Sequence, residues 1–244
     1  MSLFPENSSL TRDYAWDLCY QFFTATENQG RLLRANCDET LLLEASVHLS
    51  AYLGFFGMMR GSSFLLKTNP SFFVPIVRDI WRKAGESNYA LDSTHPDHVK
   101  PLWNTLSRSL RDASKDFRES TMPITQTLIS KILLGMFACS PAYDQYFNKG
   151  FQSVNWWTDS QQKSKQYTKI QRWNCFLGDP KTTEFLPKVR KLYALEESIP
   201  PSRVFDLFFW DLGRAQKKPR PQLSNLDPDS AMEAVLAFRA SQKA

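Results

Sequence analysis

One arginine stands alone in the most apolar part of the chain. Residues 53–66 contain fourteen residues, and Arg60 carries their only charge. Because burying an unpaired charge is costly, the guanidinium must reach solvent, pair with a carboxylate or bind an anion. The neighbouring hydroxyl groups of Ser62 and Ser63 could enlarge an anion site. The chemistry that this pattern predicts is recognition of a phosphate or a carboxylate.

Asp144 is a candidate partner for Arg60, because it lies among aromatic residues that would shield its carboxylate from water. A guanidinium and a carboxylate can form a bidentate pair, and such a pair would fix the packing of two helices. Two interpretations stay open. The pair is either structural, or part of a ligand site in an enzyme or small-ligand receptor built from Arg60, Ser62, Ser63 and Asp144.

The sequence lacks the residue patterns of the common catalytic sites. We find no Ser/His/Asp order, no Gly-x-Ser-x-Gly elbow, no phosphate-binding glycine loop and no His-Glu-x-x-His. The four cysteines lie too far apart along the chain for a zinc knuckle or a redox pair: Cys19, Cys37, Cys139 and Cys175. We therefore predict no catalytic residue, no metal and no cofactor, and we expect a binding protein in preference to an enzyme.

Positive charge is concentrated in one stretch. Residues 149–222 contain 14 Lys and Arg against 7 Asp and Glu, whereas residues 1–148 contain 14 against 15. The net charge of +5 therefore originates in the C-terminal half. Such asymmetry indicates an acidic partner, either nucleic acid or an acidic protein surface.

Aromatic side chains are interspersed with these cations, as in proteins that follow a phosphate backbone and stack on bases. A solvated helix face is the alternative interpretation, since lysine is common on surfaces. The residues that we predict to bind nucleic acid are Lys163, Lys165, Lys169, Arg172, Trp173, Lys188, Arg190 and Lys191.

Helical spacing of apolar residues accounts for most of the chain, and the nine glycines are few for a turn-rich β-protein. Asp38 is the predicted N-cap of a helix whose inner face reaches residue 53. The other predicted helices span residues 13–24, 72–83, 97–117, 124–137, 141–150, 159–176, 188–195, 203–212 and 229–240. We predict an all-α protein with one compact domain of roughly nine or ten helices.

The polar segment between residues 217 and 228 resembles a linker in composition. It divides a predicted helical core, residues 1–216, from a C-terminal helix within residues 229–244. The N-terminus lacks the basic and apolar regions of a secretory signal, and Arg60 interrupts the longest apolar stretch. We therefore expect a cytoplasmic protein that does not contact a membrane.

Three segments resemble a group of uncharacterised helical bacterial proteins, and no activity follows from the resemblance. They are HLSAYLGFFGMMRGSS at 48–63, KILLGMFACSPAYD at 131–144 and FDLFFWDLG at 205–213. The stretch from Ser130 to Asp144 is also distantly similar to the end of helical DNA glycosylase domains. The glycine loop of the helix-hairpin-helix, which precedes that region in glycosylases, is missing, and no catalytic residue is carried over.

Together these observations predict a non-enzymatic helical protein whose basic C-terminal half, residues 149–222, contacts nucleic acid or an acidic protein. In one form of this hypothesis the protein is a subunit of a larger complex. The alternative is an enzyme or small-ligand receptor around Arg60 and Asp144, distantly related to DNA glycosylases.

Overall fold

The computed structural model describes residues 10–32, 38–61, 63–86, 96–115, 124–155, 168–216 and 224–243. Within these ranges every regular element is a helix, which confirms the predicted all-α class. The described chain contains eleven α-helices and two 3-10 helices, against nine or ten helices predicted. None of the described helices is long and apolar enough to span a bilayer.

The chain divides into two compact units. Unit 1 consists of Met1–Ser93 and Asp97–Ala138, and unit 2 consists of Thr94–Pro96 and Cys139–Ala244. The predicted linker at residues 217–228 does not coincide with the boundaries between these two units. The last helix packs against the preceding helix inside unit 2.

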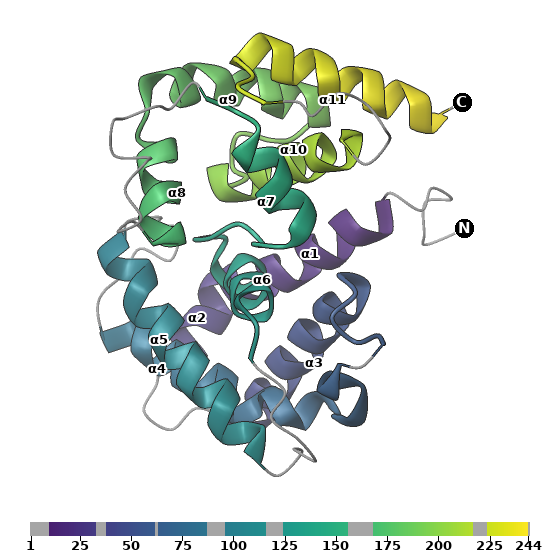
Figure 1. Cartoon of the computed structure of the whole chain (residues 1–244). Helices are drawn as coiled ribbons and strands as arrows, with labels where there is room; N and C mark the ends of the chain where they lie inside the picture. The colour runs from purple at the N-terminus through teal and green to yellow at the C-terminus, as the bar shows by residue number, and fades with distance from the viewer. Residues whose placement is uncertain are drawn as a thin grey trace, which may run out of the picture. The chain divides into compact units, whose positions relative to one another are not determined.

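Unit 1 is organised around its third helix, which contacts the first, the fourth and the sixth (Figure 1). Its elements are α1 (Leu10–Thr24), α2 (Thr26–Leu32), α3 (Glu39–Phe55), η1 (Phe64–Lys67), η2 (Pro70–Phe73), α4 (Val74–Glu86), α5 (Pro96–Ala113, in this unit from Asp97) and α6 (Gln126–Phe137). The buried indole of Trp16 in α1 donates a hydrogen bond of 3.0 Å to the carbonyl of Leu134 in α6. Aromatic and aliphatic side chains of these helices form the core.

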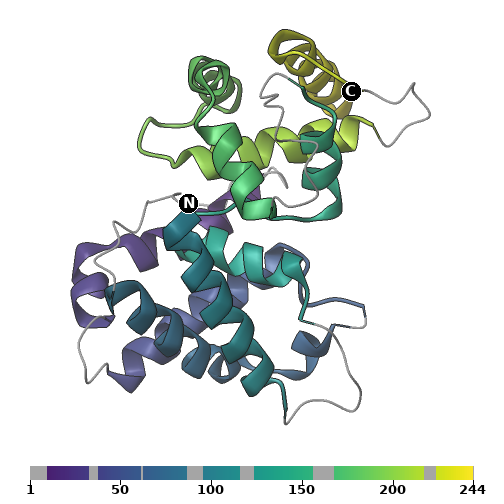
Figure 2. The same ribbon diagram turned by 60° about the vertical axis from the view of Figure 1, so that its left-hand side comes forward.

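Unit 2 is organised around α10 (Pro201–Ala215), ten of whose fifteen residues are buried. The other helices are α7 (Gln145–Gln152), α8 (Lys169–Leu177), α9 (Pro180–Tyr193) and α11 (Pro228–Lys243). Both views place α9 and α11 along the same side of α10 (Figures 1 and 2). A helix that is apolar on nearly all sides needs such a shell of neighbours.

Two glycines let α7 and α10 approach closely. A Cβ atom on Gly150 would lie 2.1 Å from the carbonyl oxygen of Phe209, and one on Gly213 would lie 1.9 Å from that of Tyr146. Both oxygens are backbone atoms that cannot move independently of their helices. Gly150 was predicted to end a helix, but it lies inside α7 and serves this contact.

Several helix starts follow the predicted capping chemistry. The side chain of Asp38 accepts a hydrogen bond from the amide of Thr40 at the start of α3, which confirms that N-cap. Helix α6 ends at Phe137 as predicted, and it begins after the cap residue Thr125. Helix α11 begins at Pro228, and the carboxylate of Asp227 accepts from the amide of Ser230.

Other boundaries were predicted wrongly. Ser140 and Pro141 do not begin a helix, because Asp144 is the N-cap of α7 and the amide of Ala142 donates instead to Asp206 at 2.8 Å. Helix α9 begins at Pro180, well before the predicted residue 188, and it accommodates Pro187. Helix α2 was not predicted at all.

Candidate functional site

Helix α8 places its aromatic side chains in the core, while Lys169 is exposed and Arg172 is half-buried. Thr168 and Gln171 form a capping box that fixes the first turn. Trp173 and Phe176 are buried and stack on each other, with ring centroids 5.1 Å apart. The indole N–H of Trp173 donates to the hydroxyl of Ser202 at 3.1 Å.

The predicted base-stacking role of Trp173 does not agree with this burial. The side chain is 1% exposed, and its ring contacts phenylalanines of α7 and α10. The indole is therefore a core group, which leaves the cations as the surface part of the predicted interface. Ser202 in the first turn of α10 is the hydrogen-bond partner of this indole.

Helix α9 presents a row of charged side chains on its exposed side. Asp179 caps the helix by accepting from the amide of Lys181 at 2.9 Å, and Pro180 follows at the first helical position. The exposed residues Lys181, Glu184, Lys188 and Lys191 recur at three- and four-residue intervals, so they share one face. Thr182, Phe185 and Val189 occupy the buried face.

The cations of α8 and α9 differ in their contacts. Lys169 lies over the ring of Tyr143, 5.4 Å from its centroid, and partial burial lowers the pKa of its ammonium group. Lys188 pairs with Asp229 of α11 at 2.9 Å. Arg190 donates to the carbonyl of Glu196, and burial lowers its pKa. These contacts hold three of the predicted binding residues against the body of unit 2.

Lys181 and Lys191 are the exposed cations with the fewest constraints. Within the part of the chain that the structure describes, neither side chain pairs with a carboxylate. Arg172 is half-buried on α8. Lys163 and Lys165, which were also predicted to bind nucleic acid, lie outside the described residues. The described part of residues 149–222 holds nine Lys and Arg against six Asp and Glu.

A half-buried polar network ties α11 to the rest of unit 2. The hydroxyl of Tyr193 donates to the carboxylate of Asp211 at 2.8 Å, and Arg239 donates to the same oxygen at 3.3 Å. The guanidinium of Arg239 also lies over the ring of Tyr193. Burial raises the pKa of Asp211 although both hydrogen bonds lower it, and burial with the nearby Asp211 charge raises that of Tyr193.

Arg60 reaches solvent, which is one of the three outcomes predicted for it. Helix α3 ends at Phe55, and Gly57 and Gly61 adopt positive φ angles of 72° and 61° in the turn that follows. The exposed guanidinium lies over Gly57, where a Cβ atom would be 2.9 Å from its Cζ. Ser63 caps η1, and Ser62 lies outside the described residues.

Asp144 has a local structural role. Its side-chain oxygen accepts hydrogen bonds of 2.9 Å from the amides of Tyr146 and Phe147 at the start of α7. Arg60 belongs to unit 1 and Asp144 to unit 2, so neither unit contains both residues. A ligand site that uses the two together stays a prediction.

The buried arginine–carboxylate pair that the sequence suggested for Arg60 is formed by other residues. Arg203 donates to Asp206 at 3.3 Å within α10, and the two side chains are 3% and 6% exposed. The other oxygen of Asp206 accepts from the amide of Ala142. Two opposite charges three residues apart in an apolar run were the sequence signal for this pair.

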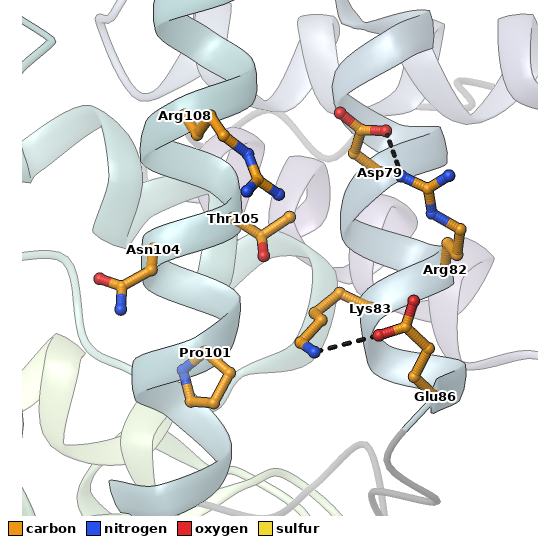
Figure 3. A pocket seen from close by; sticks show the side chains of 8 residues that line it. All are labelled: Asp79, Arg82, Lys83, Glu86, Pro101, Asn104, Thr105 and Arg108. Atoms are coloured by element: carbon orange, nitrogen blue, oxygen red, sulfur yellow. Dashed lines mark hydrogen bonds and ion pairs between the residues drawn. The ribbon is translucent and has the colours of Figure 1, made fainter.

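Unit 1 contains a charged groove that the sequence analysis did not predict. Helices α4 and α5 face each other across it, and Lys83 and Arg108 extend into the space between them (Figure 3). Its volume is about 310 Å³, and its lining residues are Asp79, Arg82, Lys83, Glu86, Pro101, Asn104, Thr105 and Arg108. The groove was missed because residues 1–148 are nearly neutral in sum.

Most charges in this groove already have partners. Arg82 pairs with Asp79 at 3.1 Å and Lys83 pairs with Glu86 at 3.0 Å, as Figure 3 shows. Ser109 donates to the second oxygen of Asp79 at 2.6 Å. An anion entering the groove must compete with two carboxylates for Arg82 and Lys83, whereas Arg108 forms no ion pair among the described residues.

The described residues contain no cluster of His, Cys, Asp and Glu that could hold a metal ion. Cys19 and Cys139 are buried, and burial raises the pKa of the Cys139 thiol to about 12, whereas Cys175 is exposed. Comparisons of the chain with models of protein families, with curated proteins and with solved structures find no match.

Proposed function

We propose that the chain is a non-enzymatic, cytoplasmic binding protein that contacts the phosphate backbone of nucleic acid through the basic face of α8 and α9. The cations of these helices are Lys169, Lys181, Lys188 and Lys191, which are exposed, and Arg172 and Arg190, which are half-buried; the exposed Glu184 lies in the same row on α9. The observation that carries the proposal is the sorting of side chains on these two helices. Their aromatic side chains Trp173, Phe176 and Phe185 are buried and Tyr193 is half-buried, whereas four of their six cations are exposed.

The sorting favours contact with phosphates over contact with bases. Lysine ammonium groups act as point charges on flexible stems, so they can neutralise phosphates without a fixed geometry. Each neutralised phosphate releases a counterion, and this release supplies binding that does not depend on sequence. Phosphate contacts of this kind position a protein on a duplex but do not select bases.

The α8–α9 face is favoured over the α4–α5 groove because two of the three cations of the groove already form ion pairs. In the groove, Arg82 and Lys83 already contact carboxylates at 3.1 and 3.0 Å. On α9, Lys181 and Lys191 have no such partner among the described residues, so a phosphate displaces no carboxylate there. Lys188, which pairs with Asp229, is the exception and is expected to contribute less.

The test is equilibrium binding of the full chain to a labelled duplex, to a single strand of the same length and to polyglutamate at several salt concentrations. We expect the duplex to bind at low salt, and binding to weaken linearly on a log–log plot as salt rises. We also expect the single strand to bind no more tightly than the duplex, since the described face offers no exposed ring for stacking.

Two results would reject the proposal. Binding of polyglutamate without binding of the duplex would indicate an acidic protein partner. A duplex affinity that is insensitive to salt, or no binding at low salt, would remove the role of the cationic face.

A further inference from the structure

The groove between α4 and α5 contains one positive charge more than its carboxylates neutralise. Three cations, Arg82, Lys83 and Arg108, line it together with two carboxylates, Asp79 and Glu86. Each carboxylate is already paired with a cation of α4. Among the described residues, Arg108 of α5 forms no ion pair and no hydrogen bond. The excess charge therefore lies on a guanidinium whose five N–H donors are available.

The donors of the groove come from both of its walls. Lys83 extends into the space from α4 and Arg108 from α5, and Thr105 lies between them (Figure 3). Thr105 and Arg108 are three residues apart, so they share one side of α5. Thr105 is buried and lines the groove, so it forms part of the floor. Two cations and a hydroxyl group from two helices therefore surround one space.

The ion pair of Lys83 is one that an entering anion can displace. Lys83 and Glu86 lie three residues apart on α4, and their side chains are 35% and 53% exposed. Exposed pairs of this kind are held weakly, because water and salt screen them. Asp79 differs, since it accepts from Ser109 of α5 at 2.6 Å as well as from Arg82. Lys83 is therefore the cation that can change its partner, while Asp79 stays fixed.

A second hollow adjoins the groove at Arg108. Its volume is about 410 Å³, and Arg108, Arg111, Asp112 and Lys115 line it. Lys115 pairs with Asp112 at 2.7 Å, and the charge of Arg108 reaches the same carboxylate only over a longer distance. Arg111 donates to the carbonyl and the hydroxyl of Ser107. The positive charge thus continues along α5 and attracts anions toward Arg108.

The arrangement of donors favours phosphate over carboxylate. A carboxylate is planar and is matched by the fork of a single arginine. A phosphate group presents oxygens in several directions, so a lysine, an arginine and a hydroxyl group can bind it from different sides.

The size and polarity of the groove restrict the rest of the ligand. The volume of about 310 Å³ is about ten times the ~30 Å³ that one water molecule occupies, which leaves room beside a phosphate group. Apart from Pro101, the lining residues are polar or charged, so the remainder must form hydrogen bonds as well. A recess of this size holds one phosphate with a short body and not the backbone of a nucleic acid.

We propose that the α4–α5 groove is a binding site for a small phosphate monoester that carries hydroxyl groups, of the class of the sugar phosphates. Arg108, Lys83 and the hydroxyl of Thr105 bind the phosphate. Glu86, released by Lys83, accepts a hydrogen bond from a hydroxyl group of the ligand. All of these residues belong to unit 1, so the inference is independent of the proposed contact with nucleic acid through unit 2.

The first experiment is a calorimetric titration of the full chain with glycerol 3-phosphate, inorganic phosphate and acetate at constant ionic strength. We expect one saturable site for both phosphates. Glycerol 3-phosphate should bind more tightly than inorganic phosphate because its hydroxyl groups add hydrogen bonds, and acetate should bind most weakly.

Two arginine variants test the assignment of the phosphate site. Arg108→Gln should weaken binding of glycerol 3-phosphate by about tenfold or more, since it removes charged hydrogen bonds. Arg111→Gln is the matched control, because it removes the same charge from an exposed residue on the next turn of α5. Arg111 lines only the second hollow, so its loss should leave the affinity nearly unchanged.

A variant that gains affinity tests the role of Lys83 and cannot be imitated by misfolding. Glu86→Gln removes the carboxylate that competes for Lys83, so inorganic phosphate should bind several-fold more tightly. Glu44→Gln is the control, since Glu44 is exposed in the same unit but does not line the groove. Circular dichroism verifies that every variant is folded.

Four outcomes would overturn the proposal. One is the absence of saturable binding of either phosphate. Another is glycerol 3-phosphate that binds no more tightly than inorganic phosphate or acetate. The third is an equal loss in Arg108→Gln and Arg111→Gln, which would indicate general attraction by the positive surface. The fourth is a Glu86→Gln variant that binds phosphate no more tightly than Glu44→Gln.

Discussion

Two arginines of this chain lie in similar sequence and in opposite environments. Arg60 follows a run of Leu, Gly, Phe and Met, and Arg203 precedes a run of Val, Phe, Leu and Trp. Arg60 is exposed in the turn after α3, whereas Arg203 is buried in α10 and paired with Asp206. Apolar neighbours along the chain therefore do not decide whether an arginine is buried.

The backbone explains the difference. Gly57 and Gly61 with positive φ end the helical path and turn the chain outward at Arg60. At Arg203 the helix continues, and a carboxylate one turn later supplies the counter-charge within the same element. In this chain, two local features indicate whether an arginine is buried better than the hydropathy of its neighbours does. Glycines that form a turn accompany the exposed Arg60, and a carboxylate three residues later on the same helix accompanies the buried Arg203.

The largest predicted effect concerns the contact of α7 with α10, the helix that contains this ion pair. Gly213→Ala would place a methyl group 1.9 Å from the carbonyl oxygen of Tyr146, so the two helices must separate. Overpacking typically costs about 1–3 kcal/mol and occasionally more, and because backbone atoms of two helices clash here we expect the free energy of unfolding to fall by more than that range. Urea denaturation followed by tryptophan fluorescence measures the change.

The control for this substitution is Gly30→Ala in α2, where no atom lies within 4 Å of the added Cβ. There alanine should leave stability unchanged or raise it by up to about 1 kcal/mol through helix propensity. Equal stabilities of the two variants would show that α7 and α10 do not pack as closely as described.

The second prediction compares the two arginine regions directly. Asp206→Ala leaves Arg203 buried without its counter-charge and the amide of Ala142 without its acceptor. We expect a loss of about 3–5 kcal/mol. Arg60→Gln should change stability by less than about 0.5 kcal/mol because the side chain is exposed.

Similar losses for both variants would contradict the comparison. They would mean that Arg60 is as firmly held within one chain as Arg203.

A smaller loss of stability than that of Asp206→Ala is predicted for Asp144, which the sequence suggested as a partner of Arg60. Asp144→Ala removes the acceptor for two amides at the start of α7 and should cost about 1 kcal/mol. Asp144→Asn retains a capping oxygen and should cost less. Thermal denaturation of the two variants gives the difference, and an equal loss for both would indicate that the charge of Asp144 matters beyond capping.

The fold could be predicted where local chemistry determines it. Asp38 caps α3 because its carboxylate accepts a hydrogen bond from an amide in the first turn. Such a cap can be predicted from Asp38 and the few residues that follow it. The start of α7 could not be predicted in this way. Asp206, far along the chain, accepts from the amide of Ala142, and this tertiary contact holds residues 139–143 outside a helix.

The sequence predicted the positive charge of the candidate site, but it did not predict which of its side chains are exposed. The cations of α8 and α9 followed from composition, but the burial of Trp173 depends on contacts with phenylalanines of other helices. The α4–α5 groove was hidden because its ion pairs join residues of opposite charge that cancel in any sum over the sequence.

The measurement that tests the proposed function most directly is the salt dependence of duplex binding for two triple variants. One variant replaces Lys169, Lys181 and Lys191 by Gln, and the other replaces Arg82, Lys83 and Arg108 by Gln. Each removes three positive charges, one set from the α8–α9 face and the other from the α4–α5 groove.

We expect the first variant to lose up to about 2.7 from the slope of log affinity against log salt, since each phosphate contact contributes about 0.9. The second variant should keep the wild-type slope. A slope that the α8–α9 variant leaves unchanged, or that only the α4–α5 variant reduces, would contradict the proposal.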